Sequence, residues 1–356
     1  MKTQLSADIQ RLNQGRVLVV GDVAIDEMTY GPTDRLSREA PVIILRHDRT
    51  DIILGAAGNA VHNIAKLGAK RAAVVGVSGK DYYCTLLLDA LERDGIDATG
   101  LVQDESRPTT TKTRISGVAN HSVTQQIVRI DRESRQPVSA AIENKLLDNI
   151  TQLAPEFDAI LLSDYDLGVM TQPVIDHCRV LAQKHGLVLA VDSQKELSLF
   201  GGATIMTPNQ PEAEKNLGHA LDTVEKVEAG GKKLLQQTGA QNLLITRSSE
   251  GMSLFESAGP ETPQKTEQVT HIPVFNRSDV FDVTGAGDTV VGTLTLAMAT
   301  GANLINACVL GNLAASIVVT RFGSATTSTD ELQDALTALP DEVLNQISAQ
   351  HAAQPK

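Results

Sequence analysis

The chain repeats one pattern of hydrophobic and polar positions along most of its length. A short run of aliphatic residues ends in one polar residue, and a stretch with helical spacing follows it. Such continuous aliphatic runs are typical of strands buried on both faces of a sheet. The runs that show the pattern span residues 16–22, 159–164, 187–192, 203–209 and 242–247, and residues 72–77 form a further aliphatic run without the polar end. Alternating strands and helices predict an α/β fold, a three-layer α/β/α sandwich around a parallel sheet.

Polar residues stand where the predicted strands end. They are Asp22, Asp164, Asp192, Asn209 and Thr246. Ligands of parallel sheets bind beyond the carboxyl ends of the strands, so we expect these side chains to face one crevice. Any one of them taken singly is better explained as a turn former, whereas five at equivalent strand ends favour a site.

Two stretches interrupt the alternation. Residues 28–54 and 109–131 contain short β-rich runs, such as 42–46 and 126–130, without helical spacing between them. They predict a small separate β-sheet, which would act as a lid beside the crevice or as a dimerisation surface. We therefore expect a single domain over residues 1–340 that carries this lid, followed by a C-terminal tail over 341–356.

Composition narrows the possible partners. The net charge is -12, aromatic residues are 3% and Trp is absent. Both features argue against nucleic-acid binding, which uses clustered cations and stacking aromatic rings. The three Cys are scattered without a C-x-x-C pair, which favours a reduced, cytoplasmic protein. The sequence has no signal-peptide pattern and no apolar run of about 20 residues, so we expect no membrane association.

The most informative chemistry lies in Gly285-Ala-Gly-Asp288, directly before a helical run. Small residues at a helix start let an anion approach the free N–H groups and the positive end of the helix dipole. A carboxylate beside that anion would accept the proton of a hydroxyl that attacks a phosphoryl group. The sequence contains no P-loop motif, and the third glycine of a dinucleotide fingerprint is missing. A plain glycine-rich turn remains the alternative for the three small residues alone.

Other polar groups suit a nucleotide. Glu212 follows the strand-end Asn209 by three residues, which suits either Mg²⁺ binding through water or capping of the next helix. Thr246, Arg247 and Gly251 combine a hydroxyl, a cation and a turn that suit nucleotide phosphates.

Near the N-terminus the residues suit a sugar. Asp26 and the segment 55–59, Gly-Ala-Ala-Gly-Asn, place a carboxylate and an amide beside another glycine-rich helix start. Carboxylate and amide groups together can accept from and donate to sugar hydroxyls.

In chain order these stretches resemble the ribokinase-like (PfkB) family of carbohydrate kinases, over nearly the whole chain. Residues 282–288, Asp-Val-Thr-Gly-Ala-Gly-Asp, are similar to the second signature of that family. Residues 55–68 are similar to the first signature, with Ala56 where a second glycine is usual. The resemblance implies a phosphotransferase that uses ATP and Mg²⁺ to phosphorylate a hydroxyl of a sugar or sugar phosphate.

The resemblance also implies roles for single residues. Asp288 would be the catalytic base, and Gly285, Ala286 and Gly287 would form the anion hole. The other implied roles are sugar binding by Asp26, Glu39, Gly55 and Asn59, nucleotide binding by Asn209, Thr246, Arg247, Gly251, Asn312 and Gly323, water-mediated Mg²⁺ binding by Glu212, and binding of a monovalent cation such as K⁺ by Asp282 and Thr284.

Within the family the chain is most similar to the kinase part of the branch that acts on D-glycero-D-manno-heptose 7-phosphate. The likeness includes residues 30–42 and 162–165. Two lysines of that branch are replaced here, one after Tyr165 by Asp166 or Leu167, and one by Gln194 in the segment 192–195, which reads Asp-Ser-Gln-Lys. Arg114 and Arg129 of the lid, with Lys112 beside them, would compensate by binding the phosphate of the substrate.

Three readings of the function therefore stay open at this point. The first is a heptose-7-phosphate kinase, and the second is a kinase of a different sugar or sugar phosphate. The third is a catalytically weak regulatory protein that binds sugar or nucleotide. We also expect a homodimer joined through the lid, because a sheet that projects beside the crevice offers a dimerisation surface.

Overall fold

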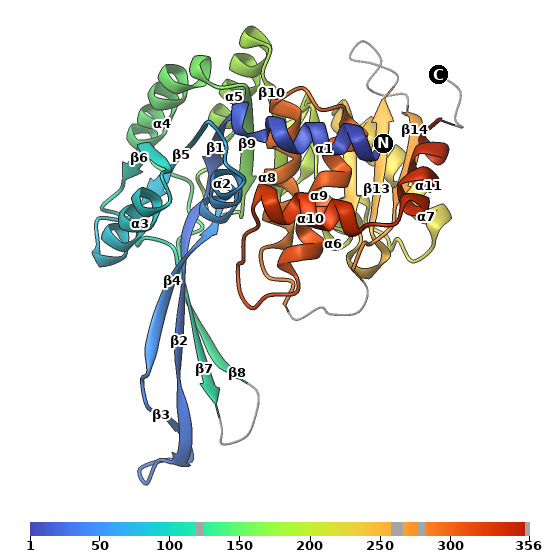
Figure 1. Ribbon diagram of the computed structural model, residues 1–356. Helices are drawn as coiled ribbons and strands as arrows, with labels where there is room; N and C mark the ends of the chain where they lie inside the picture. The colour runs from blue at the N-terminus through green and yellow to red at the C-terminus, as the bar shows by residue number, and fades with distance from the viewer. Residues whose placement is uncertain (119–123, 258–265, 277–281, 353–356) are drawn as a thin grey trace.

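Two sheets organise the chain (Figure 1), for which a computed structural model describes residues 1–118, 124–257, 266–276 and 282–352. The larger sheet has nine strands in the order β14-β13-β12-β11-β10-β9-β1-β5-β6. Pairing is parallel from β12 to β6, and the last two strands, β13 and β14, are antiparallel. Its strands are β1 (Arg16–Gly21), β5 (Arg71–Ser78), β6 (Asp97–Gln103), β9 (Ala159–Asp164), β10 (Val188–Ser193), β11 (Ile205–Met206), β12 (Asn242–Thr246), β13 (Met252–Ser257) and β14 (Thr266–Ile272). The predicted parallel strands are thereby confirmed.

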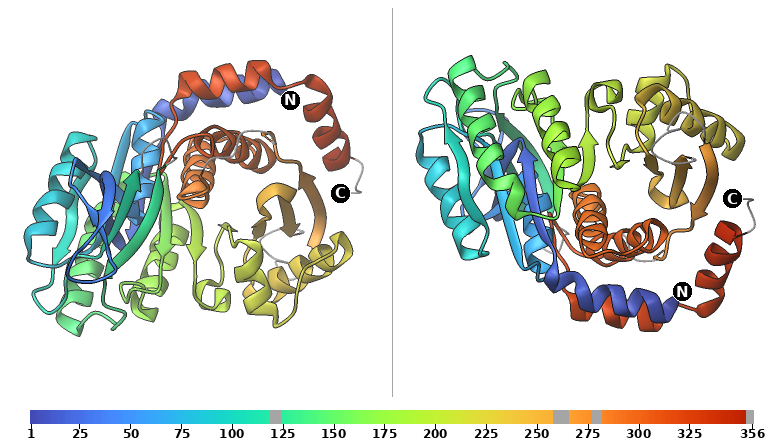
Figure 2. Two further views of the ribbon diagram at one scale, coloured as in Figure 1. Left: turned by 90° about the horizontal axis from the view of Figure 1, so that it is seen from below. Right: turned by 90° about the horizontal axis from the view of Figure 1, so that it is seen from above.

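Helices cover both faces of this sheet and bury it in two hydrophobic cores (Figure 2). In β1, Val17 and Val19 belong to one core, and Leu18 and Val20 belong to the other, because side chains alternate along a strand. One core is closed by α1 (Lys2–Arg11), α2 (Ala57–Lys66), α3 (Tyr82–Arg93), α8 (Ala286–Ala299), α9 (Leu304–Val318), α10 (Thr329–Ala338) and α11 (Asp341–Ala352). The other is closed by α4 (Ala140–Leu153), α5 (Gln172–His185), α6 (Gln210–Leu217) and α7 (Val224–Thr238). The predicted three-layer sandwich is confirmed.

The smaller sheet projects from this body as a narrow ribbon (Figure 1), and we call it the lid sheet. It consists of β2 (Val23–Leu36), β3 (Ile43–Leu45), β4 (Arg49–Ala56), β7 (Thr111–Val118) and β8 (Gln125–Arg132). β2 pairs in parallel with β7 and antiparallel with β3 and β4, and β8 pairs antiparallel with β7. The separate sheet predicted from the two β-rich stretches is therefore present. Residues 119–123 of the second stretch lie outside the described residues.

The first helix packs against the last described helices of the chain. Figure 2 shows α1 and α10 running side by side, and α11 follows α10. Leu344 and Ile347 of α11 are buried in the core, so the predicted tail begins as a packed helix. Residues 353–356 of that tail lie outside the described residues. None of the helices within the described ranges is long and apolar enough to cross a lipid bilayer.

Candidate active site

The carboxylate of Asp288 is buried in the first turn of α8 and has a partner on each oxygen. Only 4% of the residue is exposed. The amide of Asn59, on α2, donates to Oδ2 at 2.8 Å, and the hydroxyl of Tyr165, after β9, donates to Oδ1 at 2.7 Å. Three segments that are distant in sequence therefore meet at this carboxylate.

Burial changes the chemistry of Asp288. It raises the pKa of the carboxyl group from 3.8 to about 6, because the charged form loses its hydration. The hydrogen bonds from Asn59 and Tyr165 oppose that rise, as does the charge of Lys112, whereas the charge of Asp26 adds to it. A carboxyl group with a pKa of about 6 is ionised at neutral pH and can still take up a proton during a reaction.

The start of α8 presents open hydrogen-bond donors. Gly285 adopts a φ of 75°, and a Cβ there would stand 2.6 Å from Nδ2 of Asn59, so only glycine fits. A Cβ on Gly287 would meet nothing within 4 Å. Within the described residues, the backbone N–H groups of Gly285, Gly287 and Asp288 have no acceptor. The predicted anion site loses Ala286 as a donor, because its N–H donates to the carbonyl of Val283 at 3.2 Å.

The face of the lid sheet toward Asp288 carries charged side chains. Asp26, on β2, is 5% exposed and pairs with the guanidinium of Arg114, on β7. Gly55 leaves room for this carboxylate, since a Cβ would lie 3.1 Å from Oδ2 of Asp26. Ser324 also donates to Asp26, at 3.3 Å. The lid and the loop before α10 are thereby joined at one carboxylate.

Two predicted lid ligands lie further out. Arg129 stands opposite Arg114 in the register of β7 and β8, but its guanidinium is half exposed and binds Asp131 at 2.9 Å. Glu39 is exposed in the connection between β2 and β3. The structure does not bring Glu39 together with the residues around Asp288.

Asp282 ties two loops together beside the start of α8. Its carboxylate accepts from the N–H and the hydroxyl of Thr284, at 2.9 and 2.7 Å, and from the N–H of Gly323 at 3.0 Å. These contacts hold the pKa of Asp282 below its usual value despite partial burial. Asp282 and Thr284, which were predicted to bind a monovalent cation, therefore lie side by side, and the carboxylate of Asp282 already accepts hydrogen bonds.

Asn209 and Glu212 form a capping box at the start of α6. The N–H of Glu212 donates to Oδ1 of Asn209 at 2.9 Å, and the N–H of Asn209 donates to Oε2 of Glu212 at 2.8 Å. The capping alternative is thus present, yet burial raises the pKa of Glu212. Burial and the charges of Glu212 and Asp288 raise the pKa of Asp192 well above its usual value. The charge of Lys215 opposes the rise at Glu212, and the charge of Lys112 opposes the rise at Asp288.

Thr246, Arg247 and Gly251 lie at or just after the end of β12, and Asn312 lies in the middle of α9. Thr246 forms a bridge to Asn209. Arg247 closes a turn, since its N–H donates to the carbonyl of Gly251 at 2.8 Å, and Gly251 needs its φ of 80° there. The buried Nε of Arg247 has no hydrogen-bond partner among the described residues. Asn312 donates to the carbonyl of Pro273 at 2.8 Å and is buried.

The expectation that all strand-end residues face the crevice is wrong for Asp22. Its carboxylate is buried and accepts from the backbone N–H groups of Tyr165, Leu167 and Val169, at 2.8, 3.1 and 3.2 Å. Asp22 therefore shapes the loop after β9, which is the turn-former alternative. The loop after β9 also accepts a hydrogen bond from Lys195, whose Nζ donates to the carbonyl of Met170 at 3.0 Å.

Sequence reasoning missed the contact of Tyr165 with Asp288. The available signals were its place directly after the strand-end Asp164 and its membership of the stretch 162–165 that is similar to the heptose branch, and neither pointed to Asp288. Sequence reasoning also missed Ser324, which no motif singled out. Both contacts join residues that lie more than one hundred positions apart in the chain.

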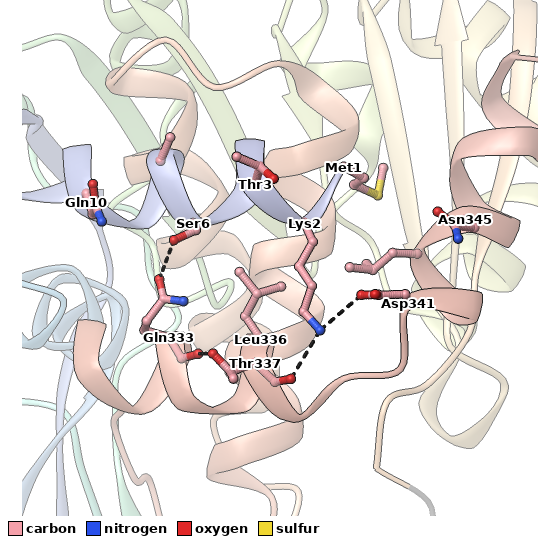
Figure 3. A pocket seen from close by; sticks show the side chains of 12 residues that line it. Met1, Lys2, Thr3, Ser6, Gln10, Gln333, Leu336, Thr337, Asp341 and Asn345 are labelled. Atoms are coloured by element: carbon pink, nitrogen blue, oxygen red, sulfur yellow. Dashed lines mark hydrogen bonds and ion pairs between the residues drawn. The ribbon is translucent and has the colours of Figure 1, made fainter.

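Two negative observations complete the site. Among the residues that the structure describes, no group of three or more His, Cys, Asp or Glu side chains could hold a metal ion. A hollow of about 740 Å³ lies between α1, α10 and α11 (Figure 3), lined by residues such as Lys2, Gln333 and Asp341. None of its lining residues is a predicted site residue, so it is separate from the chemistry around Asp288.

Comparisons with known proteins agree with this geometry. Residues 14–331 match the family described as pfkB family carbohydrate kinase. The chain is 39% identical over 353 residues to the bifunctional protein HldE of Pelobacter propionicus, which covers 99% of this chain and 67% of the relative. It is 40% identical over 320 residues to HldE of Geobacter sulfurreducens, which covers 90% of this chain and 62% of the relative. The chain thus spans about two thirds of the length of these relatives.

Solved structures show the same fold. Phosphofructokinase-2 from Escherichia coli, solved with substrates and products, has a TM-score of 0.72 at 18% identity and covers 91% of this chain and 99% of its own. Ribokinase from Arabidopsis thaliana, complexed with ribose and ATP, has a TM-score of 0.67 at 17% identity with the same coverage, 91% and 99%. At this level of identity the likeness establishes the fold alone.

Proposed function

Because the chain belongs to the pfkB family of carbohydrate kinases, we propose that it transfers the γ-phosphoryl group of ATP to a hydroxyl of a sugar phosphate. A heptose 7-phosphate is the first candidate substrate, since residues 30–42 and 162–165 are similar to that branch of the family.

One observation carries the proposal. The buried carboxylate of Asp288, with its pKa raised to about 6, stands in the same helix turn as the open N–H groups of Gly285 and Gly287. A base and an anion site side by side suit a reaction in which a hydroxyl attacks a bound phosphoryl group. A glycine-rich turn without function would not require a buried, ionised carboxylate.

The reaction balances with these groups. The substrate hydroxyl forms a bond from its oxygen to the γ-phosphorus, and its proton passes to the carboxylate of Asp288. The bond between the γ-phosphorus and the bridging oxygen of ATP breaks, and ADP leaves with that electron pair. The open N–H groups at the start of α8 stabilise the negative charge on the transferring group.

The described residues fit a magnesium-bound nucleotide. The buried Nε of Arg247, which has no partner in the described part of the chain, suits a phosphate oxygen. Burial raises the pKa of both Asp192 and Glu212, and the charge of Glu212 adds to the rise at Asp192. Mg²⁺ bound with ATP would compensate such charges and neutralise the phosphate oxygens. These residues would orient the nucleotide while Asp288 serves the acceptor.

A monovalent cation is a further part of the proposal. A structure of Escherichia coli phosphofructokinase-2, which has the same fold with a TM-score of 0.71, was solved in complex with potassium. In this chain, Asp282 and Thr284 immediately precede the anion site, and Asp282 also binds the turn at Gly323. We propose that K⁺ bound there steadies the start of α8.

We also propose that the chain forms a homodimer through the lid sheet. In the described part of the chain, seven exposed large hydrophobic side chains lie on or beside its strands. They are Leu36, Val42, Ile43, Val118, Ile127, Val128 and Ile130. An exposed apolar patch of this kind marks an interaction surface, and β8 is an edge strand that a partner could cover.

The deciding experiment is ADP release from Mg·ATP with a panel of sugars and sugar phosphates, followed by mass analysis of the product. We expect the best turnover with a heptose 7-phosphate. Asp288→Asn should retain ATP binding and lose roughly 10²–10⁴-fold in kcat, the usual contribution of a positioned base. Preference for another sugar would support the second reading. Binding of ATP and sugar without any ADP release would support a regulatory protein instead.

The phosphate of the substrate can be tested separately. Arg114→Ala should raise KM for a sugar phosphate roughly 10- to 100-fold and leave KM for ATP unchanged, because a charge-assisted hydrogen bond is lost. Arg129→Ala is the cleaner variant, since Arg114 also neutralises Asp26. If Arg129→Ala changes KM equally for phosphorylated and unphosphorylated sugars, the phosphate does not bind at this face.

A further inference from the structure

Tyr165 is held in place by three contacts, which involve its backbone N–H, its ring and its hydroxyl. Its backbone N–H donates to Oδ2 of Asp22 at 2.8 Å. Its ring lies under the ammonium group of Lys112, which is 5.2 Å from the ring centre. Its hydroxyl donates to Oδ1 of Asp288 at 2.7 Å. A side chain fixed in this way has one orientation, and that orientation points the hydroxyl at the proposed base.

We propose that Tyr165 is a positioning residue for Asp288, whose hydroxyl holds Oδ1 so that the carboxylate stays ionised and turned toward the reacting hydroxyl. This proposal rests on the kinase function proposed above. Asn59 holds the other oxygen. A carboxylate oxygen can accept two hydrogen bonds, so each oxygen keeps one position free for the proton of the substrate.

The charges around Asp288 explain why the hydroxyl is needed. On the elements that pack against it, Asp26 of β2 and Asp192 of β10 are acidic, and Lys112 of β7 is the cation that faces it. Burial and Asp26 raise the pKa of Asp288, whereas Asn59, Tyr165 and Lys112 lower it. Removal of the Tyr165 hydroxyl would leave the burial and the acidic neighbours in place. The pKa of Asp288 would then rise toward neutrality, so that about half of the base would be protonated at neutral pH.

The first test is the pH profile of kcat/KM for Tyr165→Phe in the full chain. Phe keeps the ring and its contact with Lys112, so a purely structural role would leave the profile unchanged. We expect the acid limb to move upward by about one pH unit, as expected for one lost hydrogen bond to a charged group. Activity at pH 6.5 would then fall about three-fold relative to wild type and recover above about pH 8.

Tyr83→Phe is the matched control. The hydroxyl of Tyr83 donates to Glu27 at 3.3 Å, which is also a contact between a phenol and a carboxylate, but away from Asp288. This variant should show the wild-type profile. An acid limb that stays in place in Tyr165→Phe overturns the proposal, as does an equal shift in Tyr83→Phe.

The second test needs no substrate. The chain contains four Tyr and no Trp, so its near-ultraviolet absorbance reports on tyrosine alone apart from weak Phe bands. Protonation of Asp288 removes the charged acceptor of the Tyr165 hydroxyl, so wild type should show an absorbance step near pH 6. Tyr165→Phe and Asp288→Asn should both lose this step, and Tyr83→Phe should keep it.

The two tests separate the two proposals. Absence of the step in wild type, or its persistence in Tyr165→Phe, refutes the role of Tyr165 even if the enzyme is an active kinase. If the absorbance step depends on Tyr165 but no substrate causes ADP release, the kinase function is refuted. The hydrogen bond from Tyr165 to Asp288 is then still established.

Discussion

At the scale of the residue, the burial that raises the pKa of Asp288 also lowers the stability of the folded chain at neutral pH. Its pKa is about 6 in the folded chain against 3.8 for an exposed group, so the folded state binds the proton more tightly. Its contribution to stability is therefore greatest at low pH and is lost as pH rises through about 6. Above that pH the folded state carries a buried negative charge, and this charge lowers the free energy of unfolding.

This predicts the effect of Asp288→Asn on stability. The amide is neutral at every pH, so the variant should gain up to about 3 kcal/mol in unfolding free energy at pH 8. The gain should shrink to below about 1 kcal/mol near pH 4, where the carboxyl group is protonated in the folded state and only about half ionised in the unfolded state. Urea unfolding of the two proteins at both pH values measures the difference. A variant that is no more stable than wild type at pH 8 would show that the carboxylate is better solvated than its burial indicates.

At the scale of the element, the start of α8 allows a matched pair of glycine variants. A methyl group at Gly287 meets no atom within 4 Å, and the backbone there is helical. Gly287→Ala should therefore keep or raise the unfolding free energy, by up to about 1 kcal/mol. It should lower kcat/KM roughly 10²-fold, because the methyl group would occupy the space beside the anion donors.

Gly285→Ala is the contrasting variant. It forces a non-glycine residue to a φ of 75° and places a Cβ 2.6 Å from Nδ2 of Asn59, so both stability and activity should fall. Thermal unfolding and steady-state kinetics of the two variants distinguish them. Full activity of Gly287→Ala would place the phosphoryl group elsewhere.

The loop that contains Asp282 and Thr284 predicts an ion dependence. It joins the start of α8 to the turn at Gly323 through the carboxylate of Asp282. Added K⁺ should therefore raise kcat in an assay free of Na⁺ and K⁺, and Asp282→Asn should weaken the response. If every monovalent cation leaves the rate unchanged in the wild type, the hydrogen bonds of Asp282 suffice to hold the loop.

At the scale of the whole molecule, the lid sheet determines the expected assembly. Val128 and Ile130 lie two positions apart on β8 and are 44% and 42% exposed. The double substitution Val128→Asp and Ile130→Asp should convert a dimer to a monomer in analytical ultracentrifugation, because two charges would be buried without partners. Val180→Asp is the control, since Val180 is 55% exposed on α5, which is not part of the lid sheet. An unchanged dimer in the double variant would place the interface elsewhere.

The sequence alone was sufficient for the α/β fold and the family. Within the runs 16–22 and 159–164, positions 17–20 and 159–162 are continuously aliphatic, and this pattern is typical of strands buried on both faces. The β-rich stretches likewise predicted the separate lid sheet. The position of Asp288 at a glycine-rich helix start was also readable, because cap residues act over a few positions of local sequence.

Only the tertiary structure decided which groups surround that carboxylate. Asn59, Tyr165 and Lys112 come from three separate elements, and no local pattern links them to α8. Packing also decided that the carboxylate of Asp22 accepts hydrogen bonds from the backbone of the loop after β9. It likewise decided that the N–H of Ala286 donates to the carbonyl of Val283. The reason is physical: strand and helix periods depend on neighbouring residues, whereas burial, hydrogen-bond partners and the resulting pKa depend on which distant segments fold against each other.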